Sequence, residues 1–436
     1  MSNAYNVRRM DRPVDATISI PGSKSVTNRA LILAALAGGV STLTGVLDSQ
    51  DTRVMIESLR RLGFQVEGDA AGGILRVDGR GGAIPASEAG LFLENSGTSI
   101  RFLTALCALG SGTYRLDGSD RMRVRPQADL IDALGELGVS ARSALGTGCP
   151  PLVVDGSTGL RGGRVQVGAD ASSQFLTALL MVSPFARQDV ELQIRGSLRP
   201  FYVEITTRMM EQWGVSVDLE IGAASGGSPA YSVRAGQRYL AQSDYRIEPD
   251  ASSASYFFAA AALTGGRVTV PGLGSASLQG DVRFATEALA EMGCDVQEGP
   301  GGLTVRGPLD GRLRGITRDM SAISDTSLTL AALAPFADSP TTITNVAHSR
   351  LQECDRIAAA CAELTKLGVR VEERSDGYTI YPAEAIRPAS IATYGDHRVA
   401  MSFALVGLKA DGVVIEDSGC VGKTFPEYWQ RLESLA

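Results

Sequence analysis

Histidine is scarce in this sequence, with only His348 and His397 among 436 residues. The six cysteines form no CxxC pair, and zinc sites are built mainly from several cysteine or histidine ligands. The sequence therefore predicts no metal site. Free thiols are typical of a reducing compartment, so we expect the protein to work in the cytoplasm.

Long hydrophobic segments and an excess of positive charge are also missing. The longest apolar runs, such as Ala30–Val40, have about 11 residues, whereas a membrane-spanning helix needs roughly 20. No apolar signal-peptide core follows the charged N-terminus. The net charge of −7 argues against nucleic acid as a partner. We therefore expect no membrane or nucleic-acid partner, and an anionic ligand would need a local cluster of basic residues.

Glycine is abundant instead, with 50 residues, and the sequence around it repeats. A polar start rich in Ser, Asp or Asn leads six times into a small-residue helix, a turn and an apolar strand. The starts lie about 71 to 80 residues apart, at Gly22, Asn95, Asp170, Asp250, Ser324 and Gly395. A period of this kind indicates six copies of one structural unit.

A second pattern runs between these starts. It is an amphipathic helix that ends in Leu, Met or Trp followed by glycine, and then a strand. The expected stop glycines are Gly63, Gly138, Gly214, Gly293 and Gly368. Glycine is favoured there because it adopts the left-handed conformation without steric cost. Each repeat is therefore predicted to be a βαβαββ unit.

The predicted fold class is α/β (α+β), with two pseudo-symmetric domains of three repeats each, of the inside-out α/β barrel type. Single repeats of about 73 residues would be marginally stable alone, so we expect them to group in threes. One domain would comprise residues 23–244, and the other residues 1–22 plus 245–436. The sixth copy is cut off at the C-terminus, and the N-terminal strand around Ala16–Ile20 is expected to complete it.

Basic residues gather at the predicted helix starts. A Ser, Thr, Asn or Asp opens the first helix of each repeat as an N-cap, which leaves the positive helix end available to an anion. Basic residues lie beside these starts or begin the second helices: Lys24, Arg29, Arg53, Arg101, Arg125, Arg199, Arg283, Arg356 and Arg398. The pattern indicates a small ligand with phosphate or carboxylate groups. The alternative is that these arginines cap backbone carbonyl groups or pair with acidic residues, namely Asp51, Asp281, Asp355 and Asp396.

The common nucleotide-binding and hydrolase motifs are absent. The segment GSKSVTNR lacks the GxxxxGK[ST] spacing of a P-loop, and no GxGxxG motif connects a strand to a helix. No GxSxG elbow is paired with a suitable histidine. Two carboxylates near the basic residues, Asp325 in SDTS and Glu353 in QECDR, are candidates for proton transfer. Their alternatives are an ordinary N-cap for Asp325 and a surface position for Glu353.

One enzyme family shares these motifs along the whole chain. The motifs are PGSKSVTNRALILAAL (Pro21–Leu36), ENSGTSIRF (Glu94–Phe102), RVRPQADLIDAL, DASSQF, DASSASYFFAAAA, RLQECDRI, YGDHRVAM and GKTFPEYW, in this order and spacing. On these residues the chain resembles the 5-enolpyruvylshikimate-3-phosphate synthases (3-phosphoshikimate 1-carboxyvinyltransferases) of the enolpyruvyl transferase family. That family has two domains of three βαβαββ units, which agrees with the repeat count.

The resemblance implies a transferase of the shikimate pathway, which supplies chorismate and the aromatic amino acids. Its substrates would be phosphoenolpyruvate and shikimate 3-phosphate, and its active site would lie in the cleft between the two domains. The enolpyruvyl group would pass to the 5-hydroxyl by addition and elimination, with release of phosphate. The family implies no metal, no cofactor and no covalent enzyme adduct, and we expect a monomer.

The same resemblance implies roles for individual residues. The groups around phosphoenolpyruvate would be Lys24, Asn95, Gly97, Arg125, Gln174, Arg356, Arg398 and Lys423. The contacts of shikimate 3-phosphate would be Ser25, Arg29, Ser172, Ser173, Gln174, Ser197, Tyr202, Asp325, His348 and Gln352. Asp325 would take the 5-hydroxyl proton. Lys24 and Glu353 are both candidates for delivering protons to the methylene carbon and the leaving phosphate, and the sequence does not divide these two tasks between them.

The sequence departs from the family pattern at several places. Gln352 stands where the family usually has a lysine that reaches the acceptor, and His348, often an asparagine, could compensate. The segment SLRPFYVEIT has an extra residue, which leaves the register of Ser197 and Tyr202 open. Phe102 stands where proline is common.

Three other functions compete with this interpretation. Gln352 keeps open an enolpyruvyl transferase with a different anionic acceptor. A UDP-N-acetylglucosamine enolpyruvyl transferase is disfavoured, because residues 117–125 lack the loop cysteine usual in that family. A non-enzymatic binding module is disfavoured by the presence of the residues that the chemistry needs, namely Lys24, Asp325, Glu353, Arg356 and Lys423.

Overall fold

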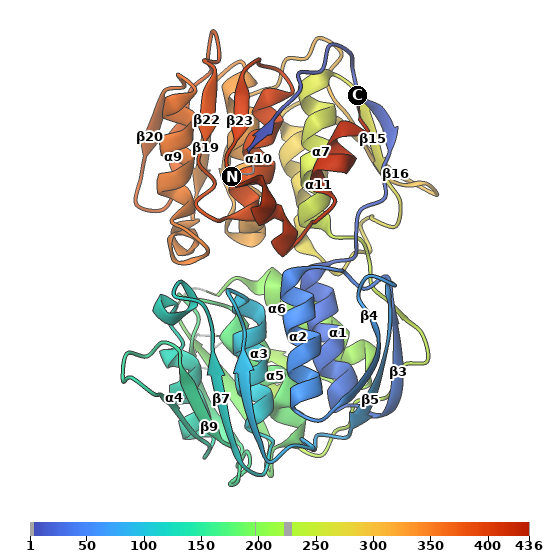
Figure 1. Cartoon of the computed structure of the whole chain (residues 1–436), viewed down its shortest axis with the longest axis vertical. Coiled ribbons are helices and arrows are strands. Elements are labelled where there is room, and N and C mark those ends of the chain that lie inside the picture. Colours follow the sequence, from blue (N-terminus) through green and yellow to red (C-terminus); the bar gives the residue numbers. More distant parts are fainter. Residues whose placement is uncertain (1–3, 197, 222–228, 436) are drawn as a thin grey trace. The chain divides into compact units, whose positions relative to one another are not determined.

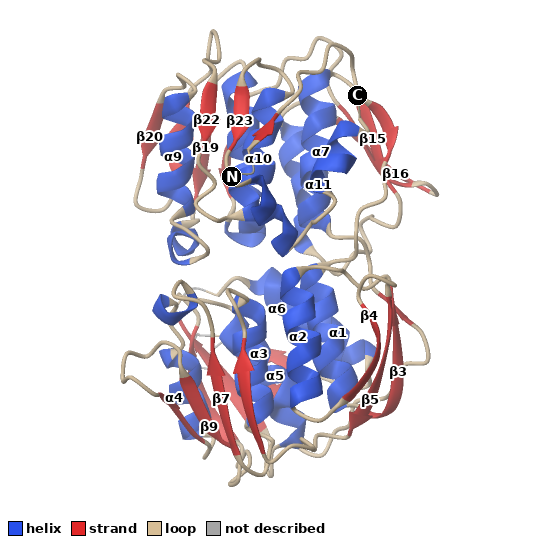
Figure 2. Cartoon of the chain, in the orientation of Figure 1, coloured by secondary structure: helices blue, strands red, loops and turns tan. Residues whose placement is uncertain are grey.

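The computed structural model describes residues 4–196, 198–221 and 229–435. The chain divides into two compact units, which we call the N-terminal unit (residues 22–247) and the C-terminal unit (residues 248–436 with residues 1–21). Among the described residues, each unit contains three β-sheets (Figure 1). Within each unit the sheets lie outside a group of packed helices (Figure 2).

The three sheets of the N-terminal unit share one topology. Their strands are β3 (Gly38–Thr44), β4 (Gln65–Asp69), β5 (Ile74–Arg80), β6 (Glu88–Phe92), β7 (Thr113–Asp117), β8 (Ser140–Ser143), β9 (Leu152–Asp155), β10 (Gly163–Gly168), β11 (Val190–Arg195), β12 (Asp218–Glu220), β13 (Ala230–Val233) and β14 (Tyr245–Arg246). The strand orders are β14-β3-β5-β4, β6-β7-β9-β8 and β10-β11-β13-β12. In each sheet the first pair is parallel and the other two pairs are antiparallel. A parallel pair needs a crossover helix, so this pattern confirms the predicted βαβαββ unit.

The first helix of each repeat forms the interior of the N-terminal unit. These helices are α1 (Lys24–Leu36), α3 (Gly97–Cys107) and α5 (Gln174–Val182), and α3 packs against the other two. Every residue of α3 is buried, as is α1 from Val26 onward. Apolar and small residues occupy all sides of these helices, and a helix of that kind is stable only when it is enclosed.

The second helices of the repeats are amphipathic and bury one face. In the N-terminal unit they are α2 (Gln50–Arg61), α4 (Ala128–Glu136) and α6 (Pro200–Gln212), with short 3-10 turns η1 (Met122–Val124) and η2 (Ser183–Phe185). A glycine with φ between 81° and 101° follows the second helix in five repeats: Gly63, Gly138, Gly214, Gly293 and Gly368. The predicted stop positions are therefore confirmed, since this region favours glycine.

The C-terminal unit repeats the arrangement with its own strands. They are β1 (Tyr5–Asn6), β2 (Asp15–Thr17), β15 (Arg267–Val270), β16 (Asp295–Gly299), β17 (Gly302–Arg306), β18 (Thr317–Asp319), β19 (Thr341–Thr344), β20 (Val371–Glu373), β21 (Tyr378–Ile380), β22 (Ala389–Ile391) and β23 (Val413–Ile415). The sheet orders are β16-β17-β15-β2, β18-β19-β21-β20 and β1-β23-β22.

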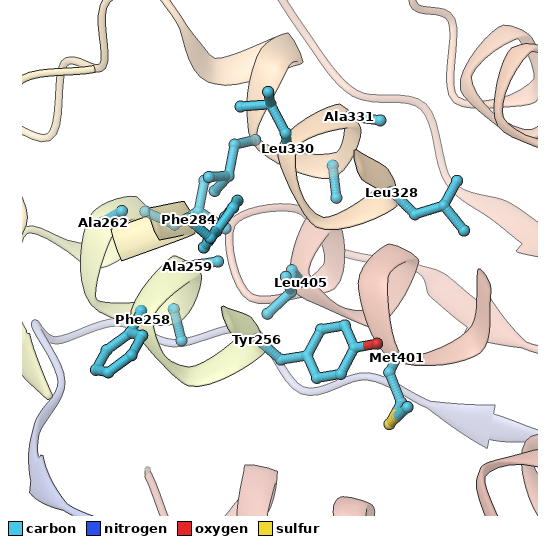
Figure 3. Packing of buried hydrophobic residues seen from close by; sticks show 14 of the residues in the cluster. Tyr256, Phe258, Ala259, Ala262, Phe284, Leu328, Leu330, Ala331, Met401 and Leu405 are labelled. Carbon is cyan, nitrogen blue, oxygen red and sulfur yellow. The ribbon is translucent and has the colours of Figure 1, made fainter. Parts of the chain in front are cut away.

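Three central helices again fill the middle of the C-terminal unit. They are α7 (Ala251–Thr264), α8 (Ser327–Leu333) and α10 (His397–Gly407). Along the chain, α9 (Arg356–Lys366) lies between α8 and α10, and α11 (Tyr428–Glu433) follows α10. Short segments complete the unit: the 3-10 turns η4 (Gly280–Val282), η6 (Ser321–Thr326), η7 (Ala334–Phe336), η8 (Ala347–Leu351) and η9 (Ser418–Lys423), and the π-helical η5 (Phe284–Leu289). Figure 3 shows side chains of α7, α8 and α10 gathered in one buried cluster, among them Tyr256, Leu328 and Leu405.

The N-terminal strand joins a different repeat from the one predicted. The strand β2 pairs in parallel with β15 and so completes the fourth repeat, not the sixth. The earlier strand β1 completes the sixth sheet by antiparallel pairing with β23. The strand that precedes α7 in the sequence, β14, is already paired in parallel with β3 of the N-terminal unit. For that reason the fourth repeat takes its first strand from the start of the chain, and the N-terminal unit runs to Ile247 instead of residue 244.

Four of the six central helices have the predicted side-chain N-cap. Ser23, Ser96, Asp250 and Asp396 each accept a hydrogen bond from a backbone N–H in the first turn. The helices α5 and α8 have none, because the preceding residues, Ser173 and Thr326, have ψ values of −13° and 1°. An N-cap side chain reaches the first turn only from an extended backbone. Among the described residues, no helix has both the length and the apolar character required to cross a membrane.

The strand β5 lies directly on the backbone of α1, and Gly79 permits this contact. A Cβ atom at Gly79 would lie 2.2 Å from the carbonyl oxygens of Ala34 and Ala37. We expect Gly79→Ala to lower the free energy of unfolding by about 1–3 kcal/mol, since overpacking forces the strand outward. Urea denaturation of the whole chain measures this. Gly90→Ala, also on a strand but with no atom within 4 Å of the added Cβ, is the control. Equal losses in the two variants would contradict the close packing.

Candidate active site

The starts of α3 and α5 meet inside the N-terminal unit. The guanidinium Nη1 of Arg101 donates a hydrogen bond of 2.7 Å to Oε1 of Gln174, the first residue of α5. The amide Nε2 of Gln174 in turn donates to Oγ1 of Thr98, at 3.4 Å. Ser172 and Ser173 are buried just before α5, and Ser172 Oγ accepts from the backbone N–H of Gln174. Polar side chains from two repeats are thus held at one end of the helix group.

Arg125 lies against the first turn of α3. Its Nη1 donates to the carbonyl oxygen of Asn95 at 3.3 Å and to Oδ1 of Asn95 at 3.2 Å. Gly97 makes room for this guanidinium, because a Cβ atom there would lie 2.5 Å from Nη2 of Arg125. The predicted group of Asn95, Gly97 and Arg125 is therefore assembled at one helix start.

Arg29 is a buried cation whose partners are neutral. Its side chain donates to Oγ1 of Thr206 at 2.7 Å and to the carbonyl oxygens of Ser25 and Tyr202 at 2.9 and 3.0 Å. The ring of Phe102 lies 5.3 Å from the guanidinium carbon. Burial lowers the pKa of Arg29 to about 9. A bound anion would relieve this desolvation, so the position suits a negatively charged ligand.

Lys24 begins α1 and faces a carboxylate. Its Nζ lies 3.6 Å from Oδ2 of Asp51, and the two side chains are 14% and 4% exposed. The structure thus places Lys24, Ser25, Arg29, Asn95, Gly97, Arg125, Ser172, Ser173, Gln174 and Tyr202 in the N-terminal unit. Ser197 lies outside the described residues.

Three of the arginines predicted at helix starts have ordinary structural roles. Arg53 is exposed and pairs with Asp48, and Arg283 pairs with Glu287 one turn along the helix. Arg199 donates to the carbonyl oxygens of residues 169 and 170. The alternative interpretation therefore holds for Arg199, which caps carbonyl groups. Arg53 and Arg283 are paired internally as well, but with acidic residues other than those expected.

Asp325 belongs to an ion cluster in the C-terminal unit. Its Oδ2 accepts a hydrogen bond of 2.6 Å from Nη2 of Arg398, and its Oδ1 lies 3.4 Å from Nη1 of Arg356. These contacts join the starts of α8, α9 and α10. Asp325 precedes Thr326, the N-cap position of α8, so the N-cap alternative for Asp325 is wrong.

Glu353 bridges two buried cations. Its Oε2 accepts from Nη2 of Arg356 at 2.9 Å, and its Oε1 accepts from Nζ of Lys423 at 2.7 Å. The side chains of Glu353 and Lys423 are 9% and 8% exposed, so the alternative of a surface glutamate is also wrong. A carboxylate between two cations beside Asp325 is suited to moving a proton near bound anions.

Asp396 is the most deeply buried carboxylate that contacts Arg356. Its carboxylate is fully buried, accepts from Nε of Arg356 at 2.8 Å, and caps α10 through the backbone N–H of Arg398. Burial opposes the charge of Arg356, but Asp396, Glu353 and Asp325 outweigh it and hold the pKa of Arg356 above its usual value. Arg356 is therefore a permanent cation that fixes three carboxylates.

His348 and Gln352 both lie near the cluster. Nε2 of His348 forms a 2.9 Å hydrogen bond with the hydroxyl of Ser324, next to Asp325. Oε1 of Gln352 accepts from Nη1 of Arg356. The unusual glutamine therefore adds a neutral contact to Arg356, where a lysine would add positive charge.

Sequence reasoning left several neighbours of these residues out of the site. Arg101 holds Gln174, and Asp396 holds Arg356, although the sequence pattern offered Asp396 only as a pairing partner. Asp281 and Tyr256 lie near Arg398, and no motif singled them out as functional. Among the described residues, no group of three or more His, Cys, Asp or Glu side chains is arranged to hold a metal ion.

Comparison with known proteins assigns the whole chain to one group. A family model for EPSP synthase (3-phosphoshikimate 1-carboxyvinyltransferase) matches residues 9–432. The 3-phosphoshikimate 1-carboxyvinyltransferase of Nostoc punctiforme is 48% identical over 430 residues, which cover 98% of each chain. The chloroplastic 3-phosphoshikimate 1-carboxyvinyltransferase of Arabidopsis thaliana is 45% identical over 97% of this chain and 83% of its own.

A solved structure has the same fold. The EPSP synthase of Acinetobacter baumannii superimposes with a TM-score of 0.80 at 23% identity, and the match covers 100% of this chain and 98% of the other. This likeness supports the architecture described above and carries no information on individual site residues.

The ion cluster makes a prediction about stability. Lys423→Met leaves Glu353 buried with Arg356 as its remaining cationic contact in the cluster. Removing one partner of a buried ion pair costs about 3–5 kcal/mol, so we expect a loss near the lower end of that range. Lys409→Met, at an exposed position, is the control. Denaturant unfolding monitored by fluorescence compares the two, and a loss no larger than that of the control would contradict the buried pairing.

Proposed function

The chain belongs to the EPSP synthase (3-phosphoshikimate 1-carboxyvinyltransferase) family, and we propose that it transfers the enolpyruvyl group of phosphoenolpyruvate to the 5-hydroxyl of shikimate 3-phosphate. The match over nearly the full length at 48% identity carries this conclusion. The buried carboxylates among cations supply groups that the reaction requires. A different anionic acceptor, the second hypothesis, has less support, because the relatives carry the name of this one reaction.

The proposed active site takes residues from both units. The N-terminal unit contributes Arg29, Ser172, Ser173 and Tyr202 toward shikimate 3-phosphate, with Ser25 and Ser197 as further contacts. Gln174 lies between the two substrates, and Asn95, Gly97 and Arg125 belong with phosphoenolpyruvate. The buried charge of Arg29, which rests on neutral oxygens, supports an anion position in this unit.

The acid–base groups of this proposal are Asp325 and Glu353 of the C-terminal unit and Lys24 of the N-terminal unit. Asp325 takes the proton of the 5-hydroxyl group while the hydroxyl oxygen forms a bond to C2 of phosphoenolpyruvate. A proton is added to the methylene carbon in the same addition. Elimination then breaks the bond from C2 to the phosphate oxygen and removes a proton from the methyl group. Lys24 and Glu353 deliver the protons to the methylene carbon and to the leaving phosphate. Arg356, Arg398 and Lys423 hold the anionic donor.

His348 and Gln352 complete the acceptor contacts of the proposal. His348 bonds to Ser324 beside Asp325, and Gln352 bonds to Arg356, which supports their place in the proposal. A monomeric state and a cytoplasmic location stay predictions from the sequence.

Loss of the two carboxylates tests the catalytic assignment. We expect Glu353→Gln and Asp325→Asn to lower kcat by roughly 10²-fold or more while the fold persists, because a positioned acid or base contributes about that factor. Release of phosphate from phosphoenolpyruvate is measured with shikimate 3-phosphate, with shikimate and without acceptor. Glu384→Gln, an exposed position, is the control. Phosphate release that does not depend on shikimate 3-phosphate would refute the proposed acceptor, and unchanged kcat in both variants would refute the assignment of the carboxylates.

Gly97→Ala tests the position of the donor. The added methyl group displaces the guanidinium of Arg125 from Asn95. A misfit of one methyl group is worth about 10- to 200-fold in affinity, so we expect KM for phosphoenolpyruvate to rise by about tenfold. KM for shikimate 3-phosphate should change much less. Gly135→Ala, where the added Cβ meets no atom within 4 Å, is the control. A rise confined to the acceptor KM would place the Gly97 turn at the other substrate.

A further inference from the structure

Asp281 is a buried carboxylate that the proposed mechanism does not use. It lies in the short turn η4, is 5% exposed, and its Oδ1 has no hydrogen-bond partner among the described residues. The turn packs against α7, η5 and η6. A polar atom that is buried without a partner costs free energy of folding. A buried carboxyl group of this kind close to the ion cluster therefore needs an explanation.

Several charged and titratable groups surround Asp281. Asp325 from η6 and Asp250 at the start of α7 add negative charge, whereas Arg398 at the start of α10 adds positive charge. Ser252 on α7 also acts on the Asp281 carboxyl group and favours its ionised form, as the smallest of these effects on its pKa. Arg398 thus acts electrostatically on Asp281 while it forms an ion pair with Asp325 in the C-terminal half-site.

The remaining neighbours are engaged elsewhere or neutral. From η5, Arg283 pairs with Glu287. The hydroxyl of Tyr256 on α7 interacts with Arg398, and burial raises the pKa of Tyr256 to about 12, so it is neutral at ordinary pH. The negative charge around Arg398 is therefore set by Asp281 together with Asp325 and Asp250.

The environment of Asp281 favours its protonated form. Burial, followed by the like charge of Asp325, raises the pKa of Asp281 to about 8, although Arg398 acts in the opposite direction. An aspartic acid in this setting is neutral near pH 7 and ionised above about pH 8. Asp281 therefore gains its negative charge in a pH range in which most other side chains do not titrate.

We propose that Asp281 is a positioning residue which, in its protonated form, leaves Arg398 available to the anionic donor substrate, and which weakens donor binding when it ionises. This rests on the proposed function, in which Arg398 binds phosphoenolpyruvate. Ionised Asp281 adds a second carboxylate beside an arginine that Asp325 already neutralises. An incoming phosphate or carboxylate then meets two negative charges, and Arg398 is drawn toward the protein interior.

Kinetics against pH test the proposal with Asp281→Asn, which has the shape of the neutral acid. For the wild type we expect KM for phosphoenolpyruvate to rise about fivefold or more between pH 7 and pH 9.5, with a much smaller change in kcat. Asp281→Asn should keep its neutral-pH KM over the whole range. Asp310→Asn, at an exposed position, should follow the wild type. A wild-type rise that persists unchanged in Asp281→Asn overturns the proposal.

The melting temperature reports on binding of phosphoenolpyruvate and on ionisation of Asp281 without any turnover. The increase in Tm caused by phosphoenolpyruvate should shrink above pH 8 in the wild type and persist in Asp281→Asn. Without ligand, the wild-type protein loses stability as pH rises from about 3.8, the pKa of Asp281 in the unfolded chain, to about 8, its pKa in the folded protein. The reason is that the folded state binds the proton more tightly than the unfolded state over this range. The Tm of Asp281→Asn should therefore exceed that of the wild type by a margin that grows over this range and then levels off.

These two measurements separate the possible failures. If the wild type releases no phosphate, the proposed function fails, while the Tm profiles still report on Asp281. If Asp281→Asn does not fold, the titration of the Asp281 carboxyl carbon by NMR in the wild type replaces it. A midpoint below pH 6, or a Tm difference independent of pH, overturns the inference about Asp281.

Discussion

Each unit is organised by one constraint: its central helices have no exposed side. The helices α1, α3 and α5, and likewise α7, α8 and α10, are enclosed by sheets and by one another. Charged side chains are unfavourable along the middle of such helices, because buried polar atoms require partners. They are accommodated at the helix ends. The first turns therefore collect the N-caps, the arginines and the carboxylates, and the βαβαββ repeat brings these turns together within each unit.

The two units solve the problem of buried charge in opposite ways. In the C-terminal unit, Arg356 is neutralised internally by Asp396, Glu353 and Asp325, which also raise its pKa. In the N-terminal unit, Arg29 is supported by neutral oxygens, and burial lowers its pKa. An internally paired cluster can move protons with little change in net charge, whereas an uncompensated cation gains from an anion. The two units thus hold their buried arginines in different electrostatic settings.

Much of this organisation could be predicted from local sequence. Helix stops such as Gly63 depend on a conformation that one residue type favours, and the apolar helices follow from their composition. The N-terminal strand was assigned to the wrong repeat, because strand pairing depends on which edge is vacant, and β14 had already filled the first sheet. Arg53 and Arg283 had the same sequence signature as Arg125, yet nearby carboxylates pair them at the surface.

The sequence by itself determined the six repeats, the family and the residue types at the helix starts, since these follow from short-range pattern and composition. Only the tertiary structure decided which charges face one another. It brought Asp325 to Arg398, buried Glu353 between Arg356 and Lys423, and buried Asp281 where both Asp325 and Arg398 act on its charge. Asp325 and Arg398 alone are separated by 73 residues in the chain, and the energy of a buried charge depends on distance and desolvation in three dimensions.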